Sequence, residues 1–430
     1  MRAAGLPIRI LFLLVSTSVS WAAANPPRVP VSQWFEQPEV HLPGWNVQVS
    51  EPVLSFPLRW AVSIRGIANV HRAKLEGHDL HFFVKVADRS GQWFPERRYS
   101  SIEKLQKGTD ITVTERFFAK PGDYQVALAI YDSTTGTHGI WKRPLHVPEL
   151  DVPVSYPEAQ AIQFIDPEVP FKPGSTPVLS PLENKKTMRV DVVLNLTERS
   201  DLEVETHTAP PPIRSRRGGW GVFTVSPEWQ MDRSRQDFVT ETLLSIADTL
   251  SSLNVNGCKR VSVVDAVRGK VFVDRRSTLD PRLILDDIRD RRATHKIDAH
   301  VLALRQQAGA FLHNYLQTVI SENAECDART FPAERVIVLV SDALVFPESK
   351  QLTPVSAPAV AEPETKFYFF RMNIYEYVQR IGMGRASTAA IPPDDQVGRL
   401  LSNLDVKRFD LANPKDFQKA LSKFLDALKQ

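Results

Sequence analysis

The spacing of apolar residues changes once along this chain, and that change constrains the fold more than any other feature. From about Trp34 to Val147, apolar residues recur at every second position, as at Phe82, Val84 and Val86. This is the pattern of half-buried β-strands. In the second half of the chain, apolar strand-like runs alternate with amphipathic helical patterns, which is typical of a parallel α/β sheet. We therefore expect two domains of different classes in these 430 residues.

The first domain, predicted over 30–148, carries the turn signals of an antiparallel sheet. The segment "PGDYQVALAIYDSTTG" at 121–136 places one turn before an alternating strand and a second turn after it. This segment resembles the final hairpin of immunoglobulin-like and fibronectin type III domains, which implies an immunoglobulin-like β-sandwich. Neither of the two cysteines lies in this region, so packing alone is expected to hold the two sheets together.

A proline-rich stretch separates the two patterns. Eight prolines occur from Pro148 to Pro181, both ends included. Proline lacks a backbone N–H and fixes φ, which prevents helix and disfavours a central strand. We predict an extended linker over 149–185.

The second domain, predicted over 186–430, reads as a doubly wound α/β fold. A polar insertion at 198–229 precedes the first helix, a helix with Leu283, Ile284 and Ile288 inward begins at Asp280-Pro281, and a long helix is predicted over 297–319. A last helix starts at Asn413-Pro414. Strands are expected at 188–196, 260–264, 270–274, 335–340, 366–372 and 406–411.

Three stretches of this domain resemble the von Willebrand factor A family. They read "RVSVVDAVRGKVFVDRRSTLDPRLILDDI", "ERVIVLVSDALVF" and "VKRFDLANPKDFQKALSKFLDAL". The resemblance covers about 186–430 and looks strongest to divergent A-domain-related proteins of acidobacterial genomes, which commonly place a sandwich domain in front. It implies a Rossmann-like α/β fold that acts by binding other proteins.

The resemblance also implies a metal-ion-dependent adhesion site, which this sequence keeps only in part. The family builds that site from Asp-x-Ser-x-Ser, a later Thr and an Asp, and a divalent cation prefers such oxygen ligands. The matching positions here are Asn195, Thr197, Arg199, Thr294 and Asp342. Asn195 removes a negative charge and Arg199 adds a positive one, so we expect a degenerate site that binds no metal.

Other sites of chemistry are not indicated. The sequence holds no nucleophile elbow, Walker loop, dinucleotide-binding glycine motif or His-Glu-x-x-His motif, so we expect no cofactor. Its formal net charge of +3 is small and its basic residues are spread out, which does not point to nucleic acid.

The first 24 residues predict export. Arg2 and Arg9 precede an apolar run, and Ala22 to Ala24 suit a signal peptidase. No later stretch has the length of a membrane span, so a secreted or periplasmic mature chain is expected. In the topology that the resemblance implies, Cys258 and Cys326 lie at the same end of the sheet, and an oxidising compartment favours a disulfide between them. Two free buried thiols are the alternative.

These features together predict an exported, non-catalytic protein of the cell envelope that binds or scaffolds another protein. Two alternatives stay open on the sequence. One is a metal-dependent adhesin, which requires Asn195 to tolerate a cation. The other is an enzyme with its site at the carboxyl ends of the parallel strands, near Asp342, where open α/β sheets bind ligands.

Overall fold

The computed structural model describes residues 27–105, 110–156, 161–165, 177–182, 186–197, 227–294, 303–322, 333–346, 352–357, 364–373 and 395–429. The predicted signal peptide, most of the predicted insertion and Cys326 lie outside these residues. The chain divides into two compact units, the first made of Met1–Glu51, Ser63–Arg116 and Asp123–His146, and the second of Pro52–Val62, Phe117–Gly122 and Val147–Gln430.

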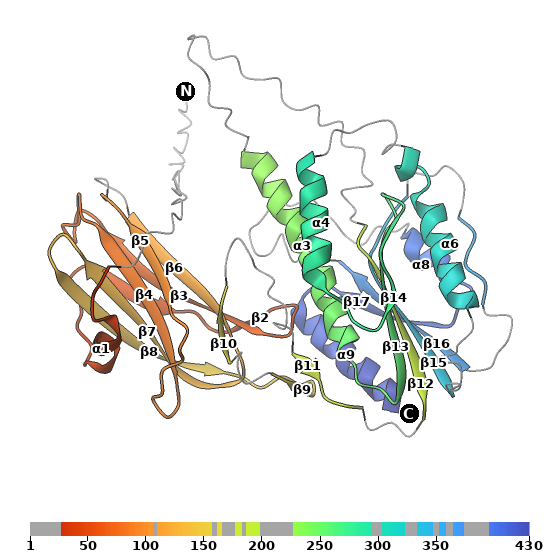
Figure 1. Cartoon of the computed structure of the whole chain (residues 1–430), viewed down its shortest axis with the longest axis horizontal. Helices are drawn as coiled ribbons and strands as arrows, with labels where there is room; N and C mark the ends of the chain where they lie inside the picture. The colour runs from red at the N-terminus through yellow and green to blue at the C-terminus, as the bar shows by residue number, and fades with distance from the viewer. Residues whose placement is uncertain are drawn as a thin grey trace, which may run out of the picture. The chain divides into compact units, whose positions relative to one another are not determined.

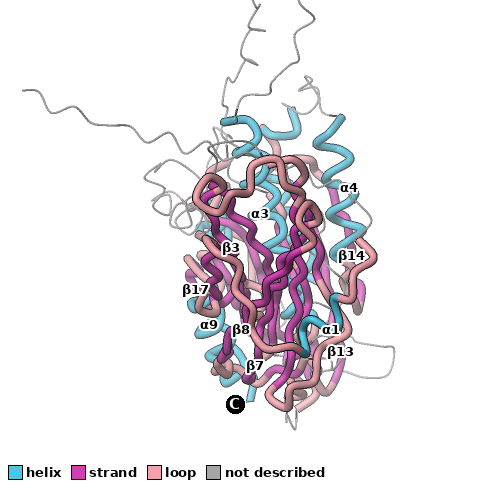
Figure 2. The backbone as a smooth tube through the Cα atoms, turned by 90° about the vertical axis from the view of Figure 1, so that its left-hand side faces the viewer, coloured by secondary structure: helices cyan, strands magenta, loops and turns pink. Residues whose placement is uncertain are grey.

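Two antiparallel sheets form the N-terminal part (Figures 1 and 2). One has the order β5-β4-β7-β8 and the other β1-β3-β6-β10, with β2 added to β3. Trp45 of β1 meets Phe82 of β4 with ring centroids 5.7 Å apart, so the sheets pack face to face and the predicted antiparallel sandwich is confirmed. The strands are β1 (Trp45–Val49), β2 (Val53–Leu54), β3 (Trp60–Asn69), β4 (Leu80–Asp88), β5 (Arg98–Ile102), β6 (Asp110–Ala119), β7 (Gly122–Asp132) and β8 (Thr137–Val147).

A short helix, α1 (Val31–Glu36), covers part of the outer face of the four-stranded sheet. Its Trp34 and Phe35 pack on Phe83 and Ile140 of that sheet. The alternating pattern was expected to begin near Trp34, and it begins later because Trp34 lies in this helix. Burial on both faces also explains why β7 is buried at consecutive positions from Val126 to Ile130 rather than at every second one.

The predicted linker differs from an unpaired extended chain where the structure describes it. It contains β9 (Val154–Ser155), β10 (Ile162–Phe164) and β11 (Val178–Leu179). β10 pairs with the end of β6, and β11 pairs with β9. The prolines limit these strands to two or three residues, while the apolar side chains between them still enter a core: Val152, Leu179 and Leu182 are buried in the second unit.

A six-stranded sheet with the order β14-β13-β12-β15-β16-β17 forms the centre of the second unit. Neighbouring strands are parallel except for the β13–β14 hairpin. The strand order reverses at β12, which is the arrangement of a doubly wound sheet. The strands are β12 (Met188–Asn195), β13 (Gly257–Asp265), β14 (Lys270–Arg276), β15 (Glu334–Asp342), β16 (Glu364–Met372) and β17 (Val406–Leu411).

Helices cover both faces of this sheet (Figure 1). On one face lie α3 (Pro227–Ser251), α4 (Pro281–Thr294) and α9 (Pro414–Lys429), packed on the β12 residues Val190, Val192 and Leu194. On the other lie α6 (Ala308–Ser321) and α8 (Gln396–Leu400), packed on Val193 and Leu339. None of the helices in the described part of the chain is long and apolar enough to cross a membrane.

Two helix predictions need correction. Residues 306–307 form a turn, so α6 begins at Ala308 and the single long helix predicted over 297–319 was wrong at this point. Leu283 was expected to point inward, but it is 67% exposed, whereas Ile284, Leu285 and Ile288 are buried. The buried face of α4 is thus centred one residue further along. Leu283, Ile284 and Leu285 are all apolar, so the sequence pattern did not show which of them faces solvent.

Candidate functional site at the carboxyl edge of the sheet

Three of the candidate positions, Asn195, Thr197 and Asp342, meet at the carboxyl ends of β12 and β15. Asn195 ends β12 and is fully buried. Its side-chain amide Nδ2 donates a hydrogen bond to Ser341 Oγ in β15, at 3.0 Å. The Ser341 hydroxyl in turn donates to the backbone oxygen of Asp342, at 3.0 Å. The amide therefore joins two parallel strands directly.

The side chains of Thr197 and Asp342 also accept hydrogen bonds from backbone N–H groups. The hydroxyl oxygen of Thr197 accepts the N–H of Ala266 at 2.7 Å, which ties the end of β12 to the turn between β13 and β14. One carboxylate oxygen of Asp342, Oδ1, accepts the N–H of Ala343 at 2.8 Å. Thr294 is the last residue of α4, and its side chain lies outside the described residues, as does Arg199.

These residues do not fit a hard divalent cation. Such an ion needs several oxygen ligands and favours anionic ones. Asp342 is the one carboxylate among the candidates, and the Asn195 amide directs its N–H, not its oxygen, toward Ser341. In the described part of the chain, no group of three His, Cys, Asp or Glu side chains could hold a metal ion.

Sequence analysis missed a second charged group on the same edge, Arg371 of β16. Arg371 is aligned with Ser341 in the neighbouring strand. Its guanidinium donates to Asp410 Oδ1 at 2.6 Å and to Asp395 Oδ2 at 3.0 Å. Burial alone would lower the pKa of Arg371, but the hydrogen bonds to Asp410 and Asp395 outweigh it and raise that pKa. The signal was a charged residue inside the aromatic run "FYFFRM".

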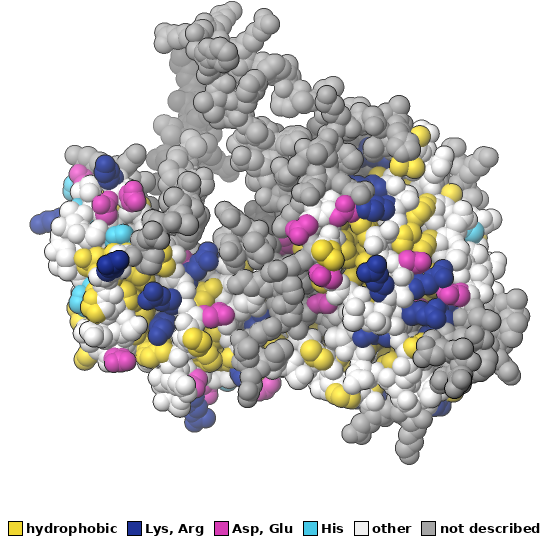
Figure 3. Space-filling model, in the orientation of Figure 1, with side chains coloured by type: hydrophobic (Ala, Val, Ile, Leu, Met, Phe, Trp, Pro, Cys, Tyr) yellow, Lys and Arg dark blue, Asp and Glu magenta, His cyan; other side chains and the backbone are white. Residues whose placement is uncertain are grey.

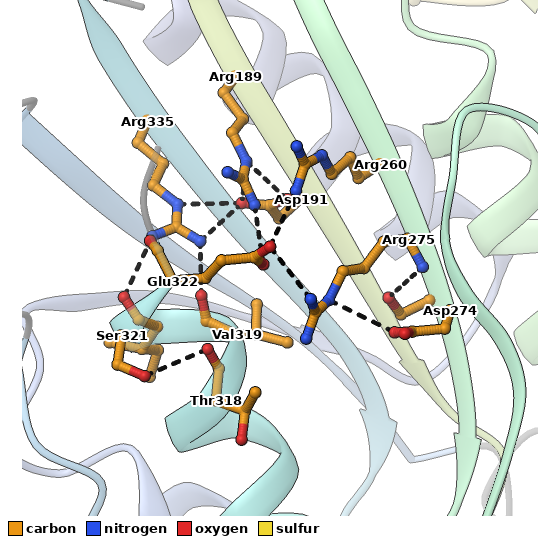
Figure 4. A network of polar contacts seen from close by, with 12 residues as sticks. Arg189, Asp191, Arg260, Asp274, Arg275, Thr318, Val319, Ser321, Glu322 and Arg335 are labelled. Carbon is orange, nitrogen blue, oxygen red and sulfur yellow. Dashed lines mark hydrogen bonds and ion pairs between the residues drawn. The ribbon is translucent and has the colours of Figure 1, made fainter. Parts of the chain in front are cut away.

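A larger charged network lies at the opposite end of the strands, the amino-terminal end of β12 and β15, next to the end of α6 (Figure 4). Asp191 of β12 is its buried centre. Arg189 Nε donates to Asp191 Oδ1 at 3.0 Å, and Arg335 of β15 donates from Nε to Oδ2, also at 3.0 Å. Side-chain exposure is 0% for Arg189, 5% for Asp191 and 3% for Arg335, so these charges have been almost completely removed from water.

Arg335 also completes the last turn of α6. Its two terminal nitrogens donate to the backbone oxygens of Val319 at 2.6 Å, Ile320 at 3.1 Å and Glu322 at 3.0 Å. A helix leaves its last carbonyl groups without intrahelical partners and carries partial negative charge at that end. The guanidinium satisfies both requirements, which offsets part of the cost of its burial. Burial lowers the pKa of Arg335, and Asp191 acts in the opposite direction.

The outer half of the network gathers around Glu322, the residue that follows α6. Glu322 Oε1 accepts from Arg260 Nη1 and from Arg275 Nη1, each at 3.1 Å, and its Oε2 accepts from Arg189 Nη2 at 3.3 Å. Arg260 belongs to β13 and Arg275 to β14. Three guanidinium groups from three strands thus converge on one carboxylate. Sequence analysis missed this network too, although charged residues inside the buried strands "MRVDVVLN" and "ERVIVLVSD" were the available signal.

Cys258 lies in β13, two residues before Arg260, and is disulfide-bonded. Cys326 is the one other cysteine of the sequence but lies outside the described residues. The predicted pairing stays a prediction, and mass analysis of non-reduced peptides tests it.

Comparisons with known proteins assign no family. No family model and no curated protein matches the chain. Among solved structures, it is similar to a β-glucuronidase from Bacteroides uniformis with a TM-score of 0.20 and 10% identity, covering 69% of this chain and 33% of that one. It is similar to a family 123 glycoside hydrolase from Clostridium perfringens with a TM-score of 0.23 and 8% identity, covering 85% and 72%. The chain thus spans about a third of the length of that β-glucuronidase, and likenesses with such low TM-scores carry no argument about fold or activity.

Proposed function

We propose that this chain is an exported, non-catalytic protein of the cell envelope that binds or scaffolds another protein. In this proposal, an immunoglobulin-like sandwich precedes a von Willebrand factor A-like domain whose metal site has been replaced by direct hydrogen bonds. The strand order β14-β13-β12-β15-β16-β17 with an antiparallel β14 supports the second assignment, since the resembled family has a hairpin-like strand pair after its first helix.

One observation carries the proposal: the hydrogen bond between Asn195 and Ser341. In the resembled family, a cation at this edge joins the strands and offers a coordination position to a partner. Here an amide and a hydroxyl join the strands without a cation, so the edge keeps its shape without a metal ion. A binding surface needs that rigidity, whereas acid–base chemistry would need accessible titratable groups, and Asn195, Ser341 and Asp342 are all at most 1% exposed.

The experiment is capture of partners by the mature full chain from envelope extracts, with two matched variants. Val345 lies in the loop after β15 at the carboxyl edge and is 40% exposed, while Leu283 lies on α4 and is 67% exposed. We expect Val345→Asp to lose a captured protein that Leu283→Asp keeps, since a charge in an apolar contact must be desolvated without compensation.

A chelator discriminates the adhesin alternative, because capture by the proposed mechanism should be unchanged when divalent cations are removed. Capture that Val345→Asp leaves intact, or that a chelator abolishes, contradicts the proposal.

A further inference from the structure

The three arginines around Glu322 have the geometry of an anion-binding site. Arg189, Arg260 and Arg275, hereafter the arginine cluster, each place a terminal guanidinium nitrogen 3.1 to 3.3 Å from the Glu322 carboxylate. Arginine is suited to this task because it stays charged and its planar group matches oxyanions such as carboxylate and phosphate. The carboxylate that occupies the cluster belongs to the chain itself.

The arginine cluster is buried at one end and partly exposed at the other. Arg189 is fully buried at its base, whereas the side chains of Arg260 and Arg275 are 24% and 31% exposed and that of Glu322 is 26% exposed. Basic side chains, with acidic ones among them, also gather on the exposed surface near β14 (Figure 3).

Backbone distortion directs Arg275 into the cluster. Arg275 has a φ of +50°, in the left-handed region that costs free energy for a residue with a Cβ. The pairing of β13 with β14 shifts register there: Val261 lies opposite Arg276, but Val263 lies opposite Val273. Such a bulge turns a side chain away from the direction that a regular strand would give it. A regular edge strand could form surface ion pairs without this strain, and retained strain is typical of ligand-binding positions.

We propose that the arginine cluster is a binding site for an external oxyanion, a carboxylate or a phosphate, which takes the place of the Glu322 side chain. Two anions repel each other at this separation, so binding requires the Glu322 carboxylate to rotate into solvent. The end of α6 need not move, because Arg335 holds it through the backbone oxygens of Val319, Ile320 and Glu322 rather than through the Glu322 side chain. The site is distinct from the carboxyl edge proposed above as the binding surface.

The test measures the thermal stability of the full chain against phosphate, formate and a short glutamate-rich peptide, with chloride at equal ionic strength as the reference. Glu322→Gln removes the internal competitor and keeps its shape. Asp287→Asn is the matched control, since it removes a carboxylate of the same domain that pairs with Lys270. Phosphate should bind Glu322→Gln about tenfold more tightly than wild type, bind Asp287→Asn as it binds wild type, and lose its effect when Arg275→Gln is added.

The three anions separate the possible sources of the ligand. A peptide that binds more tightly than formate indicates an acidic segment of a protein, and phosphate that exceeds both indicates a phosphorylated or free phosphate ligand. If Glu322→Gln folds poorly, the test uses the wild type alone. Phosphate should then raise the melting temperature of the wild type more than chloride does, and Arg275→Gln should abolish this difference. The proposal is overturned if no anion stabilises either protein beyond chloride, or if Arg275→Gln leaves the shift unchanged.

Discussion

Substitution of Asp191 should destabilise the α/β unit far more than substitution of an exposed acid in the same unit. Asp191→Asn keeps the shape of the side chain but removes the negative charge that faces Arg189 and Arg335. Removing one partner of a buried ion pair typically costs about 3–5 kcal/mol, because the other charge stays buried without compensation. Arg335 keeps its three carbonyl acceptors and Arg189 keeps Glu322, which places the expected loss near the low end, about 3 kcal/mol.

Urea denaturation followed by far-UV circular dichroism measures this loss, because the described helices other than α1 lie in the second unit. With a urea m-value of about 2–3 kcal/mol per molar, the midpoint of that unit should fall by about 1–1.5 M while the m-value stays constant. Asp287→Asn is the control: its side chain is 34% exposed and pairs with Lys270, which is 29% exposed, so its cost should stay below about 1 kcal/mol. Equal midpoint shifts for the two variants would refute the reasoning that burial sets the cost.

Four further results are expected. Millimolar Mg²⁺ should leave the melting temperature unchanged, whereas a site saturated a hundredfold above its Kd would add about 2.7 kcal/mol. Asn413→Ala should cost about 1 kcal/mol in urea, since Asn413 Oδ1 accepts two N–H groups of the first turn of α9. Trp34→Ala should cost the first unit about 3–5 kcal/mol on denaturation, by removing the buried anchor of α1. Burial raises the pKa of Glu115, and hydrogen bonds from Ser100 and Arg98 reverse that rise only in part. The folded state therefore binds the carboxyl proton of Glu115 more tightly than the unfolded state, so stability should fall as pH rises from 4.5 through the raised pKa. Melting curves recorded over this pH range should show a smaller fall for Glu115→Gln than for wild type.

Local patterns predicted most of the regular structure of the second unit. The last strand was predicted at 406–411 and has those bounds, and the Asn-Pro signal placed the start of the last helix correctly. These elements depend on residues close in the chain, namely an apolar run and a cap followed by proline. The prediction of the linker was less accurate, because whether a short apolar segment between prolines pairs with another strand depends on a partner far away in the sequence.

At the candidate site, too, the sequence identified individual residues but not the contacts between residues far apart in the chain. The resemblance proposed from the sequence pointed to Asn195, Thr197 and Asp342, and the structure places them at one edge of the sheet. It could not show that the Asn195 amide bonds Ser341, 146 residues away, because that contact depends on the register of two parallel strands.

The amino-acid sequence by itself determined where most strands and helices of the second unit form, since their periodicity and caps are properties of neighbouring residues. Only the tertiary structure decided which buried charges pair with one another. Asp191 and Arg335 are 144 residues apart in the sequence. Considered alone, each places a charge in a buried strand, which is unfavourable without a partner. The parallel register of β12 and β15 brings them within 3.0 Å, and in an interior from which water is excluded a charge is tolerated only when such a partner is in place.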